Sequence, residues 1–260
     1  MVFTNNITLY DDRFNYNRKG FCAIITQLLY IISEHNSFYG DTNICIGDSQ
    51  LLELFDNLNT VGSLDYDPSS RWLDVFFTEP DKLVYTDYNA HMPANAEVLS
   101  ELNFCLRNTI RIKPNILSEF TNLFDRYITS RTMGIQIRGT DKISEIPPID
   151  DKSIISHINY ELDNDNIDNI FLSTDDIKYV KLLTSNFGDR VVYNESNIIS
   201  NNGSAIHLNQ KHNNSRVNYE VLSNAYLLSK CKTLLYCYSN VSQLALIMGI
   251  NELNKIKLLN

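Results

Sequence analysis

The sequence lacks the glycine-rich motifs with which many proteins bind nucleotide phosphates. None of its nine glycines belongs to a GxGxxG or GxxxxGK pattern, which excludes a typical dinucleotide fingerprint and a P-loop. Arg18, Lys19 and Gly20 precede an apolar helix predicted over residues 21–34, and the free N–H groups at a helix N-terminus favour anions. A plain connection between a strand and a helix is nevertheless the favoured interpretation of this loop.

An excess of positive charge is also absent, because the formal net charge is −9 at pH 7. A broad nucleic-acid surface requires a basic face, so the sequence predicts no nucleic-acid partner. Any site for an anion should then be a local positive pocket in an acidic protein.

The five cysteines form no CxxC pair, which favours reduced thiols over a disulfide framework or a zinc site. No apolar run reaches the roughly 18 residues of a spanning helix, and the N-terminus does not resemble a signal peptide. The sequence therefore predicts a soluble, cytoplasmic protein without a transmembrane segment. It leaves the oligomeric state open.

The second half of the sequence alternates predicted helices and strands. Helices are predicted over residues 115–130, 151–163, 177–187, 217–230 and 240–248, and strands over 134–137, 169–173, 190–193 and 233–238. This alternation is typical of an α/β fold with a doubly wound parallel sheet. The first half has predicted strands near 7–10 and 42–47 and a short predicted helix over 49–58. A length of 260 residues fits two domains, with the boundary between residues 112 and 113.

Polar side chains follow three of the predicted strands. They are Arg138, Asp141 and Lys142, then Thr174, Asp175 and Asp176, then Ser239 and Ser242. If the strands are parallel, all three sets lie at one edge of the sheet, where open α/β sheets bind ligands. Arginine can bind phosphate bidentately and lysine adds a point charge. The sequence therefore indicates an anion-binding crevice; a surface cluster of ion pairs is the alternative.

Two DxD patterns and one long loop suggest further sites. Asp65 with Asp67, and Asp163 with Asp165, have the spacing that metal-dependent nucleotide-sugar transferases use, but both lie in turn-like surroundings. No metal site is therefore predicted, and a metal-dependent transferase remains an alternative. The polar stretch 194–218, with two histidines, is longer than usual for a connection and suggests a functional loop or lid. Those histidines are His207 and His212.

Five segments resemble, in order, the motifs of the α-1,6- and O-fucosyltransferase superfamily, whose core motif is close to VHVRRTDK. They are GIQIRGTDK, IFLSTDD, NGSAIHLNQ, VLSNAYLLSKC and SNVSQLA, within residues 132–249. The resemblance implies a GT-B-like architecture of two Rossmann-like domains. Residues 1–112 would face the acceptor, and residues 113–260 would bind the nucleotide sugar. It also implies GDP-fucose as the donor, no required cofactor or metal, and inversion at the sugar carbon.

The resemblance also implies roles for individual residues. Arg138 corresponds to the arginine on the donor β-phosphate. The residues implied in donor binding beside it are Lys142, Asp175, Asp176, Ser239, Ser242 and Gln243. Two positions depart from the family, because Gln136 replaces a histidine and Asn224 replaces the guanine-binding aspartate. A carboxylate accepts two N–H groups of guanine, whereas an amide offers one acceptor.

A glycosyl transfer of this kind needs cations on the departing diphosphate and a base for the acceptor hydroxyl. Arg138 and Lys142 are the predicted cations. Glu145 is the first candidate for the base, followed by Asp175 and Asp141. The prediction is an inverting, metal-independent transferase that moves fucose from GDP-fucose to a glycan hydroxyl. The alternatives are a non-catalytic nucleotide-sugar or glycan-binding protein and a transferase with a different donor.

Overall fold

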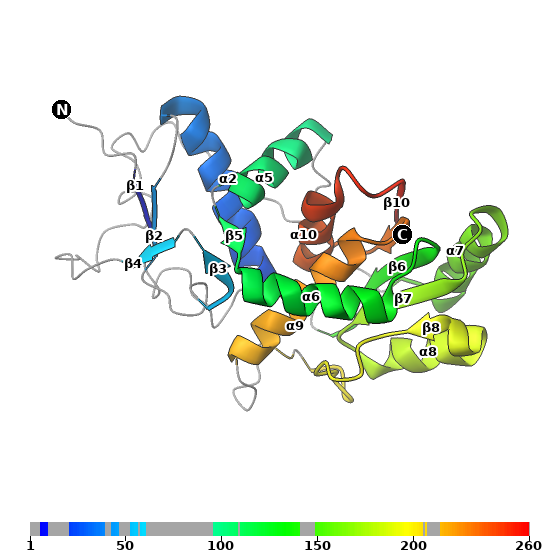
Figure 1. Cartoon of the computed structure of the whole chain (residues 1–260). Coiled ribbons are helices and arrows are strands. Elements are labelled where there is room, and N and C mark those ends of the chain that lie inside the picture. The colour runs from blue at the N-terminus through cyan, green and yellow to red at the C-terminus, as the bar shows by residue number, and fades with distance from the viewer. Residues whose placement is uncertain are drawn as a thin grey trace.

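The computed structural model describes residues 6–9, 21–39, 43–46, 53–56, 58–60, 96–108, 110–140, 149–204, 206 and 214–259. The described strands form three sheets, and the largest has five strands (Figure 1). Its strands are β6 (Thr132–Ile137), β7 (Asn169–Thr174), β8 (Val191–Val192), β9 (Thr233–Tyr236) and β10 (Lys255–Leu258). The smaller sheets contain β1 (Asn6–Leu9), β2 (Asn43–Ile46) and β4 (Leu58–Thr60), and β3 (Phe55–Asp56) with β5 (Arg111–Ile112).

The helices differ widely in length. They are α2 (Phe21–Tyr39), α5 (Ala96–Asn108), α6 (Pro114–Tyr127), α7 (Asp151–Asn164), α8 (Ile177–Phe187), α9 (Asn214–Ser229) and α10 (Asn240–Gly249), with a 3-10 turn at Gly188–Arg190. Polar side chains cap the N-termini of α7 and α10. The Asp150 carboxylate accepts from the Ser153 N–H at the start of α7, and Ser239 caps α10 in the same way through Ser242.

The five-stranded sheet has the order β10-β9-β6-β7-β8, and every neighbouring pair is parallel. This topology confirms the predicted doubly wound α/β fold. The chain leaves β6 toward β7 and β8 on one side and later returns to place β9 and β10 on the other side. The order therefore reverses between β6 and β9. Ligands of open α/β sheets bind outside the carboxyl ends of the strands at such a switch point.

Each face of this sheet is covered by its own hydrophobic core. Met133, Ile135 and Ile137 of β6 pack in one core with side chains of α7 and α8. The residues between them point to the other face, as the two-residue period of a strand requires. There, a Cβ on Gly134 would lie 3.0 Å from both Cys231 Sγ and Leu228 Cδ2. Glycine at this position therefore allows α9 to pack closely on β6.

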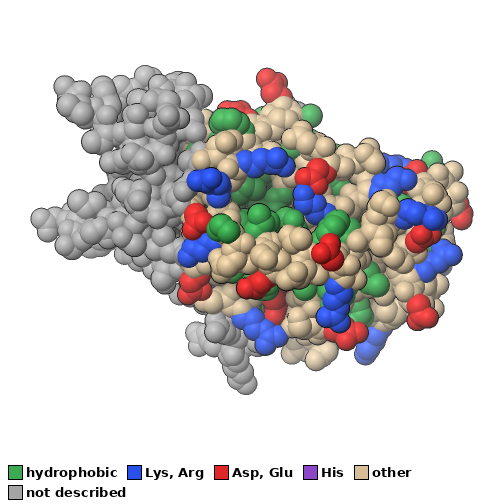
Figure 2. Space-filling model, in the orientation of Figure 1, with side chains coloured by type: hydrophobic (Ala, Val, Ile, Leu, Met, Phe, Trp, Pro, Cys, Tyr) green, Lys and Arg blue, Asp and Glu red, His purple; other side chains and the backbone are tan. Residues whose placement is uncertain are grey.

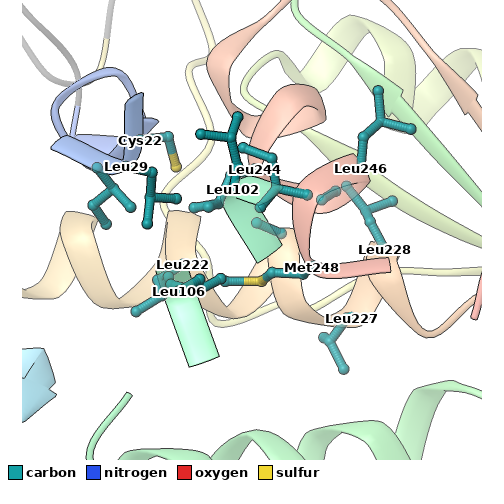
Figure 3. Close-up of a cluster of buried hydrophobic side chains, with 14 of the residues drawn as sticks. Cys22, Leu29, Leu102, Leu106, Leu222, Leu227, Leu228, Leu244, Leu246 and Met248 are labelled. Atoms are coloured by element: carbon teal, nitrogen blue, oxygen red, sulfur yellow. The ribbon is translucent and has the colours of Figure 1, made fainter. Parts of the chain in front are cut away.

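The second core joins helices from both halves of the sequence. Figure 3 shows leucines of α2, α5, α9 and α10 meeting in this cluster, among them Leu29, Leu102, Leu222 and Leu244. The amide of Asn103 in α5 also donates to the carbonyl oxygen of Ile247 in α10 at 2.8 Å. Helices α2 and α5 thus pack on the same core as α9 and α10. The domain boundary between residues 112 and 113 stays a prediction.

Several elements differ from the predicted ones. The helix predicted over 49–58 is wrong in its second part, because Phe55–Asp56 and Leu58–Thr60 are strands. Phe55 pairs with Ile112 and stacks on Phe21, so a tertiary contact overrides the local pattern. Helix α6 ends at Tyr127 and not at residue 130, because Ile128 is extended. Helix α5 and strand β10 were not predicted.

Candidate functional site

Asp175 fastens the turn after β6 to the end of β7. Its Oδ1 accepts from the Gly139 N–H at 2.8 Å, and its Oδ2 accepts from the Thr140 hydroxyl at 2.6 Å. Arg138 Nε lies 3.5 Å from the same Oδ2. The Arg138 side chain is 17% exposed and the Asp175 side chain 23%. Asp175 therefore holds Arg138 at the carboxyl edge of the sheet, inside a partly closed environment.

The neighbouring acid, Asp176, has a different structural role. Asp176 caps α8, because its Oδ1 accepts from the Lys178 N–H at 2.8 Å. The close packing here also explains Gly139, where a Cβ would lie 2.5 Å from Tyr179 Cε2 and 2.8 Å from Asp176 Cβ. The two acids that the sequence groups together thus fix two structures, the turn at Arg138 and the start of α8.

Gln136 is the buried centre of a polar network between β6, β9 and α10. Its Oε1 lies 2.8 Å from Ser242 Oγ, 3.1 Å from Ser239 Oγ and 3.1 Å from Cys237 Sγ. The Ser242 N–H donates to Ser239 Oγ at 3.1 Å. All four side chains are buried. The two serines predicted to bind phosphate therefore organise the N-terminus of α10 from the inside.

Cys237 links this network to Arg138. Its sulfur accepts from the Arg138 backbone N–H at 3.3 Å and lies at hydrogen-bonding distance from Gln136 Oε1. Burial raises the pKa of the Cys237 thiol to about 11, and the Arg138 N–H opposes this shift. The thiol is therefore protonated at neutral pH. It acts as a hydrogen-bonding spacer and not as a nucleophile.

Helix α2 brings the first half of the sequence to this site. Burial raises the pKa of the Cys22 thiol to about 12, and the positive charge of Arg138 opposes the shift. The guanidinium thus lies within electrostatic reach of the first turn of α2. Farther along this helix, the Tyr30 hydroxyl accepts from Gln243 Nε2 at 3.4 Å. Gln243, predicted to bind the donor, therefore contacts α2.

Two polar residues from separate segments meet beside the same edge. The Asn197 amide, after β8, donates to Asn224 Oδ1 of α9 at 3.0 Å. One turn earlier in α9, Glu220 accepts from the Ile198 N–H at 2.8 Å and from Arg216 Nε at 2.8 Å. The sequence predicted Asn224 as a site residue but gave no signal for Asn197 or Glu220. Their contacts depend on how the loop folds back over α9.

Several predicted residues lie outside the described part of the chain. They are Asp141, Lys142, Glu145, His207, His212, Asp65, Asp67, Arg18, Lys19 and Gly20. The other DxD pattern lies at the end of α7, where Asp165 Oδ2 accepts from Lys255 Nζ at 3.1 Å. Among the described residues, no group of three or more His, Cys, Asp or Glu side chains could hold a metal ion.

Charged groups of both signs are interspersed on the face seen in Figure 2, and they do not form one basic patch there. This distribution agrees with the net charge of −9. Within the described ranges, no helix is both long and apolar enough to span a lipid bilayer. The compartment in which the protein acts stays a prediction.

The switch point, the parallel sheet and the helices on both faces define a GT-B-like α/β fold of the kind found in fucosyltransferases. The fucosyltransferase NodZ from Bradyrhizobium matches with a TM-score of 0.59 at 12% identity, over 98% of this chain and 94% of that chain. NodZ α-1,6-fucosyltransferase soaked with GDP-fucose matches with a TM-score of 0.54 at 14% identity, over 95% and 93%.

A plant enzyme gives the same result. A mutant of FUT1 from Arabidopsis thaliana in complex with GDP matches with a TM-score of 0.52 at 13% identity, over 98% of this chain and 70% of that chain. No protein-family model and no curated protein matches the sequence. The resemblance to the fucosyltransferase superfamily is therefore confirmed at the level of the fold.

Proposed function

We propose that the protein is an inverting glycosyltransferase that transfers fucose from GDP-fucose to a glycan hydroxyl and requires no metal. The observation that carries this proposal is Arg138, which Asp175 holds at the carboxyl end of the central strand, beside the switch point. An arginine fork is suited to a diphosphate, whose charge increases as the sugar departs. The fold shared with enzymes crystallised with GDP or GDP-fucose supports the choice of ligand.

The diphosphate would lie between the turn after β6 and the N-terminus of α10. Arg138 neutralises the phosphates from one side, with Lys142 as the second predicted cation. The first backbone N–H groups of α10 supply the positive end of a helix dipole on the other side. The Gln136 network holds this N-terminus in place through Ser239 and Ser242. In this arrangement the serines position the helix that faces the phosphates.

The acceptor hydroxyl needs a base as the new bond forms. Both oxygens of Asp175 already accept hydrogen bonds from the turn that carries Arg138. This engagement favours a positioning role for Asp175 and leaves Glu145, then Asp141, as the proposed base. The resulting roles are phosphate binding by Arg138, positioning by Asp175 and deprotonation by Glu145.

A different nucleotide sugar is the second candidate donor. Asn224 presents an amide where a carboxylate would bind guanine most fully, and its Oδ1 already accepts from Asn197. This observation bears on the identity of the nucleobase in the donor and not on the transfer chemistry. A non-catalytic nucleotide-sugar or glycan-binding protein is the remaining alternative, in which the same site binds a donor without transferring its sugar.

The proposal is tested by calorimetric titration with GDP, UDP, CMP and GDP-fucose in the presence and absence of EDTA, followed by a transfer assay with glycan acceptors. We expect GDP and GDP-fucose to bind equally well in EDTA and fucose to appear on an acceptor. Tighter binding of UDP or CMP than of GDP would indicate that the donor is a different nucleotide sugar. Binding without transfer to any acceptor tested would favour the non-catalytic protein, and no binding would contradict the proposal.

A further inference from the structure

The loop after β8 continues the support of β7 at the carboxyl edge of the sheet. Strand β8 itself pairs with β7 at residues 170 and 171. Farther along, the Ser200 N–H donates to the Asp175 carbonyl oxygen at 2.9 Å, and the Ile177 N–H donates to the Ser200 carbonyl oxygen at 3.0 Å. These bonds form a parallel bridge between Ser200 and Asp176. Ser200 therefore takes the place of a neighbouring strand beside Asp175.

Two charged residues of α9 fix the start of this loop. Arg216 Nη2 donates to the Ser196 carbonyl oxygen at 2.6 Å, and the Ile198 N–H donates to Glu220 Oε2 at 2.8 Å. Arg216 Nε also pairs with Glu220 Oε1 at 2.8 Å, one turn along the helix. The Arg216 side chain is 57% exposed, whereas that of Glu220 is 10% exposed. Both oxygens of Glu220 are thus bound within the protein, where they fasten the loop to α9.

A short series of contacts connects Glu220 with Arg138. Glu220 holds Ile198, which lies two residues before Ser200. Ser200 holds the backbone of Asp175, and Asp175 Oδ2 lies 3.5 Å from Arg138 Nε. Bidentate binding of a phosphate requires a defined orientation of the guanidinium plane, and small displacements at a binding group can follow from changes at a remote residue. A shift of the loop should therefore reach the guanidinium through Asp175.

We propose that Glu220 is a positioning residue for the donor diphosphate, acting through the loop at residues 196–200 and through Asp175 on Arg138. This inference rests on the proposed function. A carboxylate in direct contact with a diphosphate would repel it. Because the charge of Glu220 is instead paired with Arg216 inside the protein, this acid can support anion binding from a distance.

The first test is calorimetric titration of Glu220→Ala with GDP. We expect affinity to fall by about threefold to tenfold, and Glu220→Gln, which keeps an oxygen for the Ile198 N–H, to recover part of the loss. Tyr219→Phe is the matched control, because it removes a hydrogen bond from α9 to Glu119 of α6. Unchanged affinity in Glu220→Ala, or an equal loss in Tyr219→Phe, would overturn the inference. Denaturant unfolding shows that each variant is folded.

A double-mutant cycle separates positioning from a general effect on folding. Asp175→Ala removes the link through which Glu220 reaches Arg138. In that background, Glu220→Ala should weaken GDP binding by less than about twofold, so that the two losses are not additive. If Glu220→Ala does not fold, Arg216→Met removes the exposed half of the same pair and replaces it in the cycle. The same loss in both backgrounds would overturn the inference and leave the proposed function intact, whereas failure of the wild-type protein to bind GDP would overturn both.

Discussion

Two arginines flank the central strand β6, and each pairs with an aspartate that flanks β7. Arg131, before β6, pairs with Asp168, before β7; Arg138, after β6, pairs with Asp175, after β7. The side chains of the first pair are 46% and 49% exposed, whereas those of the second are 17% and 23% exposed. The same two residue types thus form a solvated ion pair at the amino edge and a sheltered one at the carboxyl edge.

The two edges also differ in the helix ends that they carry, and therefore in the charge that they favour. At the amino edge, the C-terminus of α7 presents carbonyl groups, and Lys232 Nζ donates to the Asp165 carbonyl oxygen at 2.8 Å. Lys255 also binds Glu161 and Asp165 there. At the carboxyl edge, α8 and α10 begin, and helix N-termini favour anions. Cations at the amino edge therefore stabilise the fold, whereas Arg138 is placed beside groups that favour an anionic ligand.

Removing each arginine in turn should give the largest difference between the two edges. Arg138→Ala should lower fucosyl transfer by about 100-fold or more, because it removes the cation from the departing diphosphate. Its free energy of unfolding should change by about 1 kcal/mol or less, since Asp175 keeps two other hydrogen bonds. Transfer assays and denaturant unfolding measure the two effects. Arg131→Ala is the matched control, and a similar loss of transfer in it would refute the distinction.

The amino edge should respond through stability. Lys255→Met removes the cation from Glu161, whose side chain is fully buried. We expect a loss of about 1–3 kcal/mol in the free energy of unfolding, because a buried carboxylate loses its hydrogen bond. Lys257 Nζ lies 4.0 Å from Glu161 and still offers it a positive charge, so we expect the loss to be near the lower end of this range. GDP affinity should not change, and a weakened affinity in the folded variant would argue against separate roles for the edges.

A smaller effect distinguishes the two aspartates. Asp175→Asn keeps a side-chain oxygen for the Gly139 N–H but removes the charge beside Arg138. GDP affinity should fall by about tenfold, because the arginine is less firmly oriented. Asp168→Asn should leave affinity unchanged and alter stability by about 0.5 kcal/mol or less, as is usual for exposed pairs. Calorimetric titration of both variants with GDP measures the two affinities. If Asp175→Asn bound GDP as tightly as Asp168→Asn, Asp175 would not position Arg138 for the ligand.

The smallest effect is the response of stability to acid. The hydrogen bond from Lys255 lowers the pKa of Asp165 in the folded state, with a further contribution from Glu161. A depressed carboxyl pKa stabilises the fold above the unfolded value of about 3.9, and this contribution is lost as the pH falls through the folded pKa. The free energy of unfolding, measured with denaturant between pH 2 and 6, should depend less steeply on pH in Lys255→Met than in the wild-type protein. The same slope in both proteins would be the contrary result.

The features that could be predicted from sequence follow local rules. The alternation of helices and strands gave the parallel sheet, and parallel strands necessarily bring Arg138 and Asp175 to one edge. A cap at Ser239 or Asn240 could be predicted because serine and asparagine both favour the position before a helix, and Ser239 is the cap that forms. These are properties of short segments, and tertiary contacts do not alter them here.

The remaining features depend on contacts between distant segments. The Gln136 network requires the register of β6 against β9, which places residue 136 beside residue 236. The approach of α2 to Arg138 requires the core shared by α2 and α10. Strand β3 forms because Phe55 meets Ile112. Composition and periodicity contain no information on such pairings, so the polar network and the contribution of α2 could not be predicted.

Hydrogen–deuterium exchange with and without GDP tests whether the donor binds at the carboxyl edge of the sheet, because it reports on both edges at once. We expect GDP to slow exchange in peptides that cover residues 138–140 and 239–243, and in the loop at residues 196–200. Peptides that cover residues 129–132, 165–168 and 254–257 should be unchanged. Slower exchange at the amino edge, or GDP binding without slower exchange at residues 138–140, would contradict the placement of the donor at the carboxyl edge.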